Sequence, residues 1–496
     1  MNITQPRPLK RALIGTVALT LLLGNLGLSN QARADVKWPK YQDPMIFNFM
    51  DEKFDTNFNL LRPEAYSNEK SGHTPWSSSY WPDEEGGIAV RYQTRGDGKI
   101  GKNKTAFRAQ HYSLSELKAM AASQIALLSP AEKLDIINGD YTYAFTNHVL
   151  DGSEKAKSWE GICHGWGPAA ADYPEPQNTS ITTKDGIVVP VGSGDMKALM
   201  AYYYAWKASS GNESDRIPED DHYTNDNIWF DSNNVFHQRD PNAIPFIYRG
   251  LGLRCGAEEG VDSCGHNGMN PAAFHIALAN IVGKYQRSYV VNVVGNNQIW
   301  NQPVYGYNSI VKESKQLKLN SNERAPYNAD GSLSDTPAVK RLLVETEFYY
   351  VDEPEARDLK SMYSPLGTPD KSSKTLSSKH LAYYLDLDAN DNIIGGAWST
   401  PFFLWSSKDK RSDKIGFAWR ASRVPFTGQF AVLNTLYKSS AQFATSYAAS
   451  RNYTPGLQDI YFEVDASTIP EYIWPTQSTL FPAAPQVSSF ISKLFQ

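Results

Sequence analysis

The chain has 496 residues, of which 41% are hydrophobic and 12% aromatic, and its formal net charge is −5 at pH 7. This composition excludes an intrinsically disordered chain, and the length allows two or three domains. The acidic balance and the lack of a run rich in lysine or arginine argue against nucleic acid as a partner.

The N-terminal segment has the pattern of a secretory signal peptide. Lys10 and Arg11 precede an apolar stretch, which is followed by the small-residue sequence QARA ending at Ala34. This pattern predicts residues 1–34 as a signal peptide cleaved after Ala34, and therefore a secreted or periplasmic protein with no membrane association once the signal is removed. The alternative is a single membrane anchor, for which an apolar run of about 17 residues is short.

Residues 35–150 are predicted to form an irregular stretch followed by helices. One helix is expected in SLSELKAMAASQIALL, where Ser113 and Glu116 have the spacing of a capping box. The next is expected in SPAEKLDIING, which has a serine cap, a proline at the first helical position, a glutamate at the third and a terminal glycine.

Residues 151–312 are predicted to form the catalytic core. A helix is expected after Cys163, with Pro168 near its start, and a hairpin that turns at Asp185-Gly186 follows in TSITTKDGIVVPV. Further helices are expected in GSGDMKALMAYYYAW and MNPAAFHIALANIVGKY. The strand predicted in SYVVNVVG has one face formed by Val290, Asn292 and Val294.

Residues 336–496 are predicted to form a β-rich C-terminal region. Strand-like runs occur in RLLVETEFYYV, HLAYYLDLDANDNIIGGAWST and KIGFAWRA. Together with the helices of the central region, they predict an α/β (α+β) fold.

The chain contains three cysteines, Cys163, Cys255 and Cys264. In an exported protein an odd number leaves one thiol for reaction or for an intermolecular bridge. The short segment CGAEEGVDSC favours a Cys255–Cys264 disulfide, which leaves Cys163 free, although pairings that use Cys163 remain open.

Cys163 is the leading candidate for a nucleophile. It lies in WEGICHGWGPAA, where Gly161 and Gly165 permit close approach of a substrate. A thiol near a helix N-terminus has a lowered pKa, and the N–H groups there can hold an oxyanion. The alternative is a buried and inert cysteine.

A thiol nucleophile needs a base and an orienting group. His164 is poorly placed as the base because neighbours on a helix point about 100° apart. His275, in the apolar stretch AAFHIALAN, is the predicted base, with a satisfied structural histidine as the alternative and His266 as the second candidate. The predicted orienting group is Asn292, with Asp195 as its alternative because that aspartate also suits a helix cap.

Other catalytic and metal patterns are absent or weak. The stretch DLDANDN imitates the start of a Ca²⁺ loop but lacks the required glycine and final glutamate, so a hairpin turn is favoured. The sequence has no H-E-x-x-H, paired C-x-x-C or G-x-S-x-G pattern.

Several segments together resemble the secreted transglutaminase elicitors of oomycetes and their bacterial relatives. WEGICHGWGPAA is similar to the active-site segment of that family, and IWNQPVYGY is similar to its exposed W-N-Q-P-V elicitor segment. TPWSSSYWP, SPAEKLDIINGD and NIIGGAWSTPFFLW give further similarity, in the same order along the chain. The elicitor segment departs from the family at Tyr305 and in the three residues after Tyr307, which argues against plant recognition.

The resemblance implies a transglutaminase with a cysteine-protease-like core of opposite hand. Cys163 is its implied nucleophile, with His275 and Asn292 as weaker assignments, and Ca²⁺ is an implied cofactor without assigned ligands. The implied partners are proteins with accessible glutamine, and lysine or small amines as acceptors. The alternatives are a cysteine peptidase or amidase that uses water, and a non-catalytic envelope-binding protein.

Overall fold

The computed structural model describes part of the chain. Its described residues are 38, 43–47, 53–67, 74–91, 111–152, 156–207, 228–230, 236–238, 248–251, 269–293, 300–317, 338–353, 365–366, 368–369, 371–372, 374–399, 415–416, 418–421 and 426–439. The predicted signal peptide, the Cys255–Cys264 pair and His266 lie outside them. Within the described ranges, no helix combines the length and apolar character that a membrane span requires.

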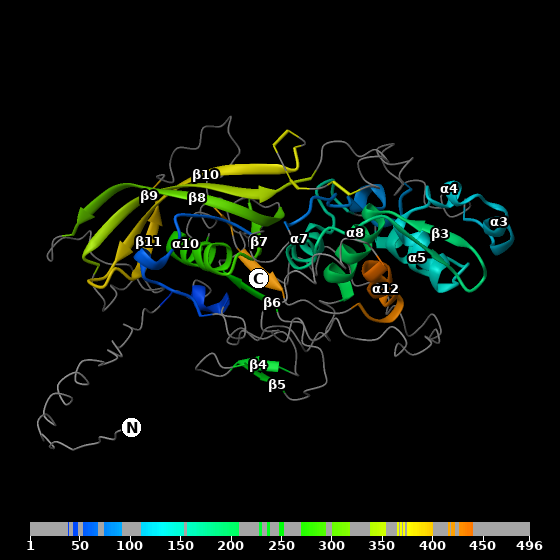
Figure 1. Cartoon of the computed structure of the whole chain (residues 1–496), viewed down its shortest axis with the longest axis horizontal. Helices are drawn as coiled ribbons and strands as arrows, with labels where there is room; N and C mark the ends of the chain where they lie inside the picture. Colours follow the sequence, from blue (N-terminus) through cyan, green and yellow to red (C-terminus); the bar gives the residue numbers. More distant parts are fainter. Residues whose placement is uncertain are drawn as a thin grey trace, which may run out of the picture. The chain divides into compact units, whose positions relative to one another are not determined.

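The helices belong mainly to the first half of the chain (Figure 1). The α-helices are α3 (Leu114–Ala119), α4 (Ala122–Ile125), α5 (Pro130–Asn138), α6 (Ala144–Gly152), α7 (Cys163–Asp172), α8 (Ser193–Tyr202), α10 (Pro271–Leu278) and α12 (Val432–Ser439). Two π-helical segments extend α8 and α10, namely η8 (Tyr203–Lys207) and η10 (Ala279–Lys284). Short 3-10 turns are η1 (Pro44–Phe47), η2 (Phe58–Leu60), η3 (Asp83–Glu85), η4 (Gly87–Ala89) and η11 (Gly428–Phe430).

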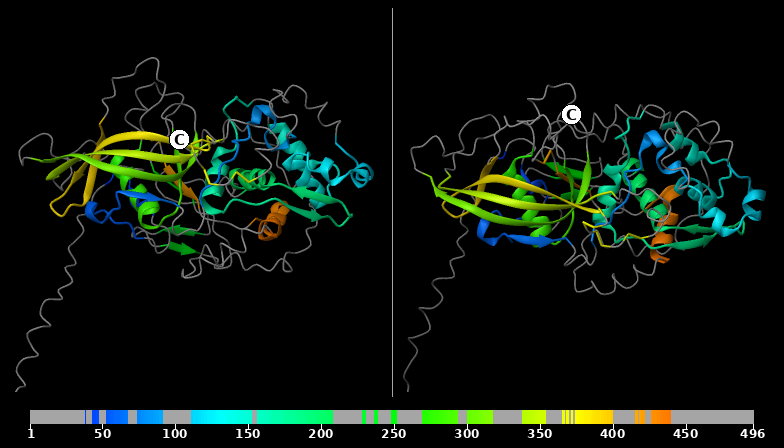
Figure 2. Two further views of the ribbon diagram at one scale, coloured as in Figure 1. Left: turned by 45° about the horizontal axis from the view of Figure 1, so that its top comes forward. Right: turned by 90° about the horizontal axis from the view of Figure 1, so that it is seen from above.

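An antiparallel sheet dominates the second half. The strands are β1 (Glu64–Tyr66), β2 (Thr179–Thr182), β3 (Val188–Val191), β4 (Ile228–Phe230), β5 (Phe236–Gln238), β6 (Tyr248–Leu251), β7 (Val290–Asn292), β8 (Asn301–Gln316), β9 (Lys340–Val351), β10 (Leu376–Leu387), β11 (Ile393–Trp398) and β12 (Ala418–Ala421). The main sheet has the order β11-β10-β9-β8-β7-β12-β6, with β1 also paired to β8. Figure 2 shows the long strands of this sheet, coloured green to yellow, in two further views. The predicted α/β (α+β) fold class is confirmed.

The long strand β8 connects the predicted regions. It passes residue 312, the predicted end of the catalytic core, without interruption. Its first residues pair with β7 and the remainder pairs with β9, so one sheet continues on both sides of that boundary.

Local capping signals fix the helices of the first half. Ser113 with Glu116, and Ser129 with Glu132, form the predicted capping boxes. The stretch after Ser113 forms two short helices where one was expected. The reason is that Met120 is extended and the Gln124 side chain accepts a hydrogen bond from the Ala121 N–H at 2.9 Å, which caps a new helix.

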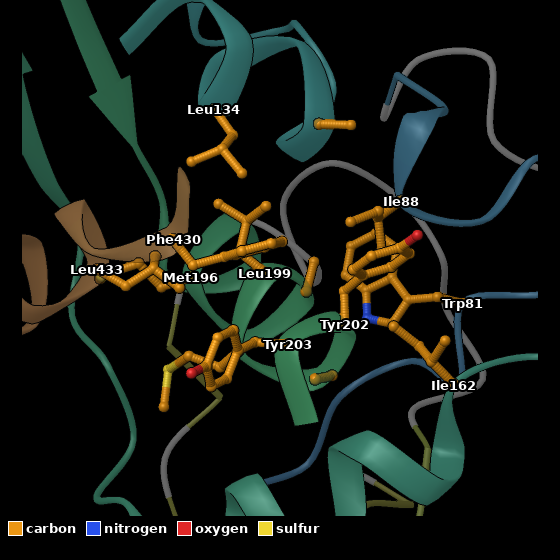
Figure 3. Close-up of a cluster of buried hydrophobic side chains, with 14 of the residues drawn as sticks. Trp81, Ile88, Leu134, Ile162, Met196, Leu199, Tyr202, Tyr203, Phe430 and Leu433 are labelled. Carbon is orange, nitrogen blue, oxygen red and sulfur yellow. The ribbon is translucent and has the colours of Figure 1, made fainter. Parts of the chain in front are cut away.

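Two buried hydrophobic clusters support these halves. The helical cluster gathers around α5, α7 and α8 (Figure 3), and its labelled members are Trp81, Ile88, Leu134, Ile162, Met196, Leu199, Tyr202, Tyr203, Phe430 and Leu433. The second cluster packs α10 against β10 and β11. Strand β7 contributes to both clusters. Successive side chains of a strand point to opposite faces, so Val290 belongs to the first cluster and Val291 to the second. Helix α7, which contacts β7, β8 and α8, therefore lies where the helices meet the sheet.

Candidate active site

Helix α7 begins at Cys163, five residues earlier than Pro168 would suggest. The Ile162 N–H donates a hydrogen bond to the Tyr80 carbonyl oxygen at 2.8 Å, which anchors the residue before the cysteine. A Cβ atom on Gly161 would overlap that same carbonyl oxygen, and one on Gly165 would overlap the Ala201 carbonyl oxygen of α8. These glycines therefore admit neighbouring backbone, where the sequence suggested room for a substrate.

The thiol of Cys163 is held by the start of β8. The side chain is 7% exposed, and the Asn301 amide Nδ2 lies 3.8 Å from Sγ. The backbone N–H groups of Asn301 and His164 also hydrogen-bond to the sulfur and lower its pKa. Burial outweighs them, with a contribution from the charge of Glu353, and raises the pKa of the thiol to about 11. The helix terminus alone suggested a lowered pKa, so desolvation reverses that expectation.

This environment makes the thiol slow to react at rest. Alkylation of Cys163 by iodoacetamide is expected to be slow at pH 7 and to accelerate by about tenfold per pH unit in the alkaline range, because only the thiolate is nucleophilic. Mass spectrometry of the peptide that contains Cys163 separates it from the other two cysteines. Modification at pH 7 at the rate of an unperturbed cysteine would contradict the buried, protonated thiol.

Asn301 is a site residue that the sequence analysis did not assign. It belongs to the segment IWNQPVYGY, and the adjacent Trp300 ring lies edge-on to Tyr80 at 5.4 Å. Asn301 and Gln302 are both buried, although the resembling family segment is exposed. The start of this segment therefore lies against the thiol. Its similarity to the family's W-N-Q-P-V segment was the feature of the sequence that could have pointed to Asn301.

The imidazole of His164 is turned away from the thiol. Its ring is hydrogen-bonded to backbone groups of Gly161 and Ala205, and burial lowers its pKa to about 4. Ala205 lies in the π-helical segment η8. The prediction that His164 is not the partner of Cys163 agrees with this orientation.

The structure does not bring His275 to Cys163. Its Nδ1 is 2.8 Å from the Tyr383 hydroxyl, its ring stacks on Phe58, and burial lowers its pKa to about 4. Tyr383 is linked through Thr346 to Ser309, which lies on β8 roughly 26 Å beyond Asn301 at strand spacing. The polar partner that this buried histidine requires is therefore a tyrosine of the sheet.

Asn292 lies across the sheet from Asn301, and its side chain supports the backbone of the site. It pairs with Asn301 across β7 and β8, and its Oδ1 accepts a hydrogen bond from the Trp300 N–H at 3.0 Å. The alternative, Asp195, accepts the Gly192 N–H at 2.7 Å at the start of α8 and forms an ion pair with Lys133. Both side chains organise the backbone around the site.

A carboxyl pair near the thiol was also missed by the sequence analysis. Glu353, just beyond β9, lies with both carboxyl oxygens 3.4 Å from Gln302 Nε2. Its neighbour Asp352 accepts a hydrogen bond from the Ser377 hydroxyl at 2.6 Å. Burial and the proximity of Asp352 raise the pKa of Glu353 well above its usual range. Since no sequence motif marks this pair, only the sheet register brings it to the cysteine.

The stretch DLDANDN forms the hairpin turn between β10 and β11. Asp388 Oδ1 accepts hydrogen bonds from the N–H groups of Asn390 and Asn392, each at 2.8 Å. Asp386 is paired with Arg341, and Asp391 with Lys340. Among the residues with described positions, no group of three histidine, cysteine or acidic side chains is arranged to hold a metal ion. The implied Ca²⁺ therefore stays a prediction without assigned ligands.

Comparison with known proteins identifies the family of the chain. The family model of the transglutaminase elicitor matches residues 44–210 and 261–428. The crystal structure of the GP42 transglutaminase from Phytophthora sojae is similar with a TM-score of 0.45 and 20% sequence identity, covering 79% of this chain and 94% of that chain. No curated protein matches the chain in sequence. Since the two segments matched by the family model span more than half of the chain, the chain belongs to the transglutaminase elicitor family.

Proposed function

We propose that the protein is an exported thiol acyltransferase of transglutaminase type, with Cys163 as its nucleophile. The observation that supports this most directly is the arrangement of N–H donors around the sulfur. The Asn301 side-chain amide and the backbone N–H groups of Asn301 and His164 all converge on Sγ. Donors placed at a thiol in this way can also stabilise the oxyanion of a tetrahedral intermediate.

The proposed reaction has two steps. Sγ of Cys163 attacks the carboxamide carbon of a glutamine, the C–N bond breaks, and the thiol proton leaves with the nitrogen as ammonia. The nitrogen of an amine then attacks the thioester, so that an amide forms and the thiol is restored. Because the resting thiol is protonated, proton transfer must accompany the attack. Ca²⁺, which the family resemblance implies, stays a prediction without assigned ligands.

His266, the second predicted base, lies outside the described residues and stays a prediction. Export is proposed from the signal-peptide pattern and from membership of a family of secreted elicitors. Protein-bound glutamine is the proposed acyl donor, and lysine or a small amine is the acceptor.

The test is to incubate the mature protein with a glutamine-rich protein and a labelled primary amine, with and without Ca²⁺. We expect label incorporation together with release of ammonia. Prior alkylation of Cys163 at alkaline pH is expected to block both. Hydrolysis of glutamine or cleavage of the chain without incorporation would instead indicate an amidase or peptidase. A protein that shows neither would fit the non-catalytic alternative.

A further inference from the structure

A buried hydrogen-bond acceptor on β8, one residue along the chain from the amide that contacts the thiol, lacks a partner among the described residues. The Gln302 side chain is 2% exposed, and its Oε1 has no hydrogen-bond partner within the described structure. Leaving a buried polar atom unpaired is costly, so such an atom marks a place where a donor belongs. The nitrogen of the same amide is 3.4 Å from both oxygens of Glu353, which places the unpaired acceptor next to a carboxyl group.

These groups belong to the active site. Gln302 directly follows Asn301, whose amide contacts the sulfur of Cys163. Burial is the main cause of the raised pKa of the thiol, and the charge of Glu353 contributes to it, which indicates that the carboxyl group lies near the sulfur. Asp352 and Glu353 are both partly exposed, whereas Gln302 is enclosed. The carboxyl pair is therefore more accessible to solvent than the Gln302 amide that contacts it.

We propose that Glu353 and Gln302 form the subsite that receives the ammonium group of the acyl acceptor. This inference rests on the proposed transferase function and assigns the residues that select its second substrate. An alkylammonium carries three N–H donors and one positive charge. Gln302 Oε1 supplies a neutral acceptor for those donors, and Glu353 supplies a charged one when its carboxyl group is ionised. Water carries no charge, so the subsite favours an amine over water at the thioester.

The same carboxylate prepares the amine for attack. A bound ammonium is not nucleophilic until it gives up a proton. A partly desolvated carboxylate beside Asp352 holds a proton more readily than a fully exposed one. Glu353 takes that proton, and the amine nitrogen attacks the thioester carbon. The C–N bond forms and the C–S bond breaks. The second nitrogen proton passes to the departing sulfur, so the products are the amide, the Cys163 thiol and a protonated Glu353.

The test measures how the thioester divides between amine and water. Wild type and Glu353→Gln are given a glutamine peptide with either cadaverine, which is a cation at neutral pH, or hydroxylamine, which is uncharged. The ratio of amide to hydrolysed product does not depend on the rate of thioester formation. We expect Glu353→Gln to lower this ratio for cadaverine by roughly 10- to 100-fold, from the loss of one charged hydrogen bond, and to leave it nearly unchanged for hydroxylamine.

Two further variants complete the design. Gln302→Met removes the unpaired acceptor without adding charge and is expected to raise the KM for cadaverine. Glu347→Gln, which changes a partly exposed carboxylate on β9, is the matched control and is expected to behave as wild type.

Ammonia release without amine shows that each variant still folds and forms the thioester. If only the rate of ammonia release changes while the cadaverine ratio does not, the subsite assignment is overturned. If wild type releases no ammonia from glutamine, the proposed function itself fails.

Discussion

Replacing Cys163 with alanine is expected to abolish acyl transfer, with label incorporation reduced at least about 1,000-fold because the covalent step is lost. The substitution removes one sulfur atom from a buried position and leaves the α7 backbone in place. We therefore expect the circular dichroism spectrum and the thermal midpoint to remain close to those of wild type. Loss of incorporation in a folded variant would identify Cys163 as the nucleophile.

Asn301→Ala is the matched comparison, because it removes the side-chain donor and retains the thiol. Loss of one donor that stabilises an oxyanion lowers kcat by about 100- to 1,000-fold in other enzymes, so residual transfer is expected. An Asn301→Ala variant as active as wild type would show that this amide has no part in the reaction. An active Cys163→Ala variant would remove the thioester mechanism altogether.

Features governed by neighbouring residues could be predicted from the sequence. The capping box of Ser129 and Glu132 formed as expected, because its chemistry is contained in four residues. The hairpin of β2 and β3 likewise turns through Gly186, whose φ of 81° suits glycine. The entry to α10 through Asn270, which caps the Ala272 N–H at 2.9 Å, followed from the same kind of local rule.

The partners of the thiol could not be predicted in the same way. Asn301 lies 138 residues from Cys163 in the chain, and Glu353 joins the site only through the pairing of β8 with β9. The sequence around His275 favours it as the base because a buried histidine needs a polar partner. The sequence does not show which residue that partner is. Tyr383 satisfies it from β10. The pKa of the thiol could not be predicted for a related reason, because the helix terminus is visible in the sequence and the degree of burial is not.

Replacing Lys133 with methionine is expected to destabilise the helical half by about 3–5 kcal/mol, because it leaves a buried charge without its counterion. Lys133 Nζ lies 2.6 Å from Asp195 Oδ2, and both side chains are 0% exposed. The pair joins α5 to α8, and α8 packs against α7, which carries Cys163. The measurement is the free energy of unfolding from urea titration, followed by tryptophan fluorescence.

The double variant Lys133→Met with Asp195→Asn is the matched control. It removes both charges, so no unpaired carboxylate remains buried, and the amide of asparagine can still accept the Gly192 N–H at the start of α8. We expect it to recover most of the lost stability, since replacing a buried ion pair as a whole costs far less than breaking it. Equal destabilisation of the single and double variants would mean that the unpaired charge is not the cause of the loss. The loss would then come from what both variants lack besides the ion pair, namely the hydrogen bond that Lys133 Nζ donates to the Ala126 carbonyl oxygen at 2.8 Å.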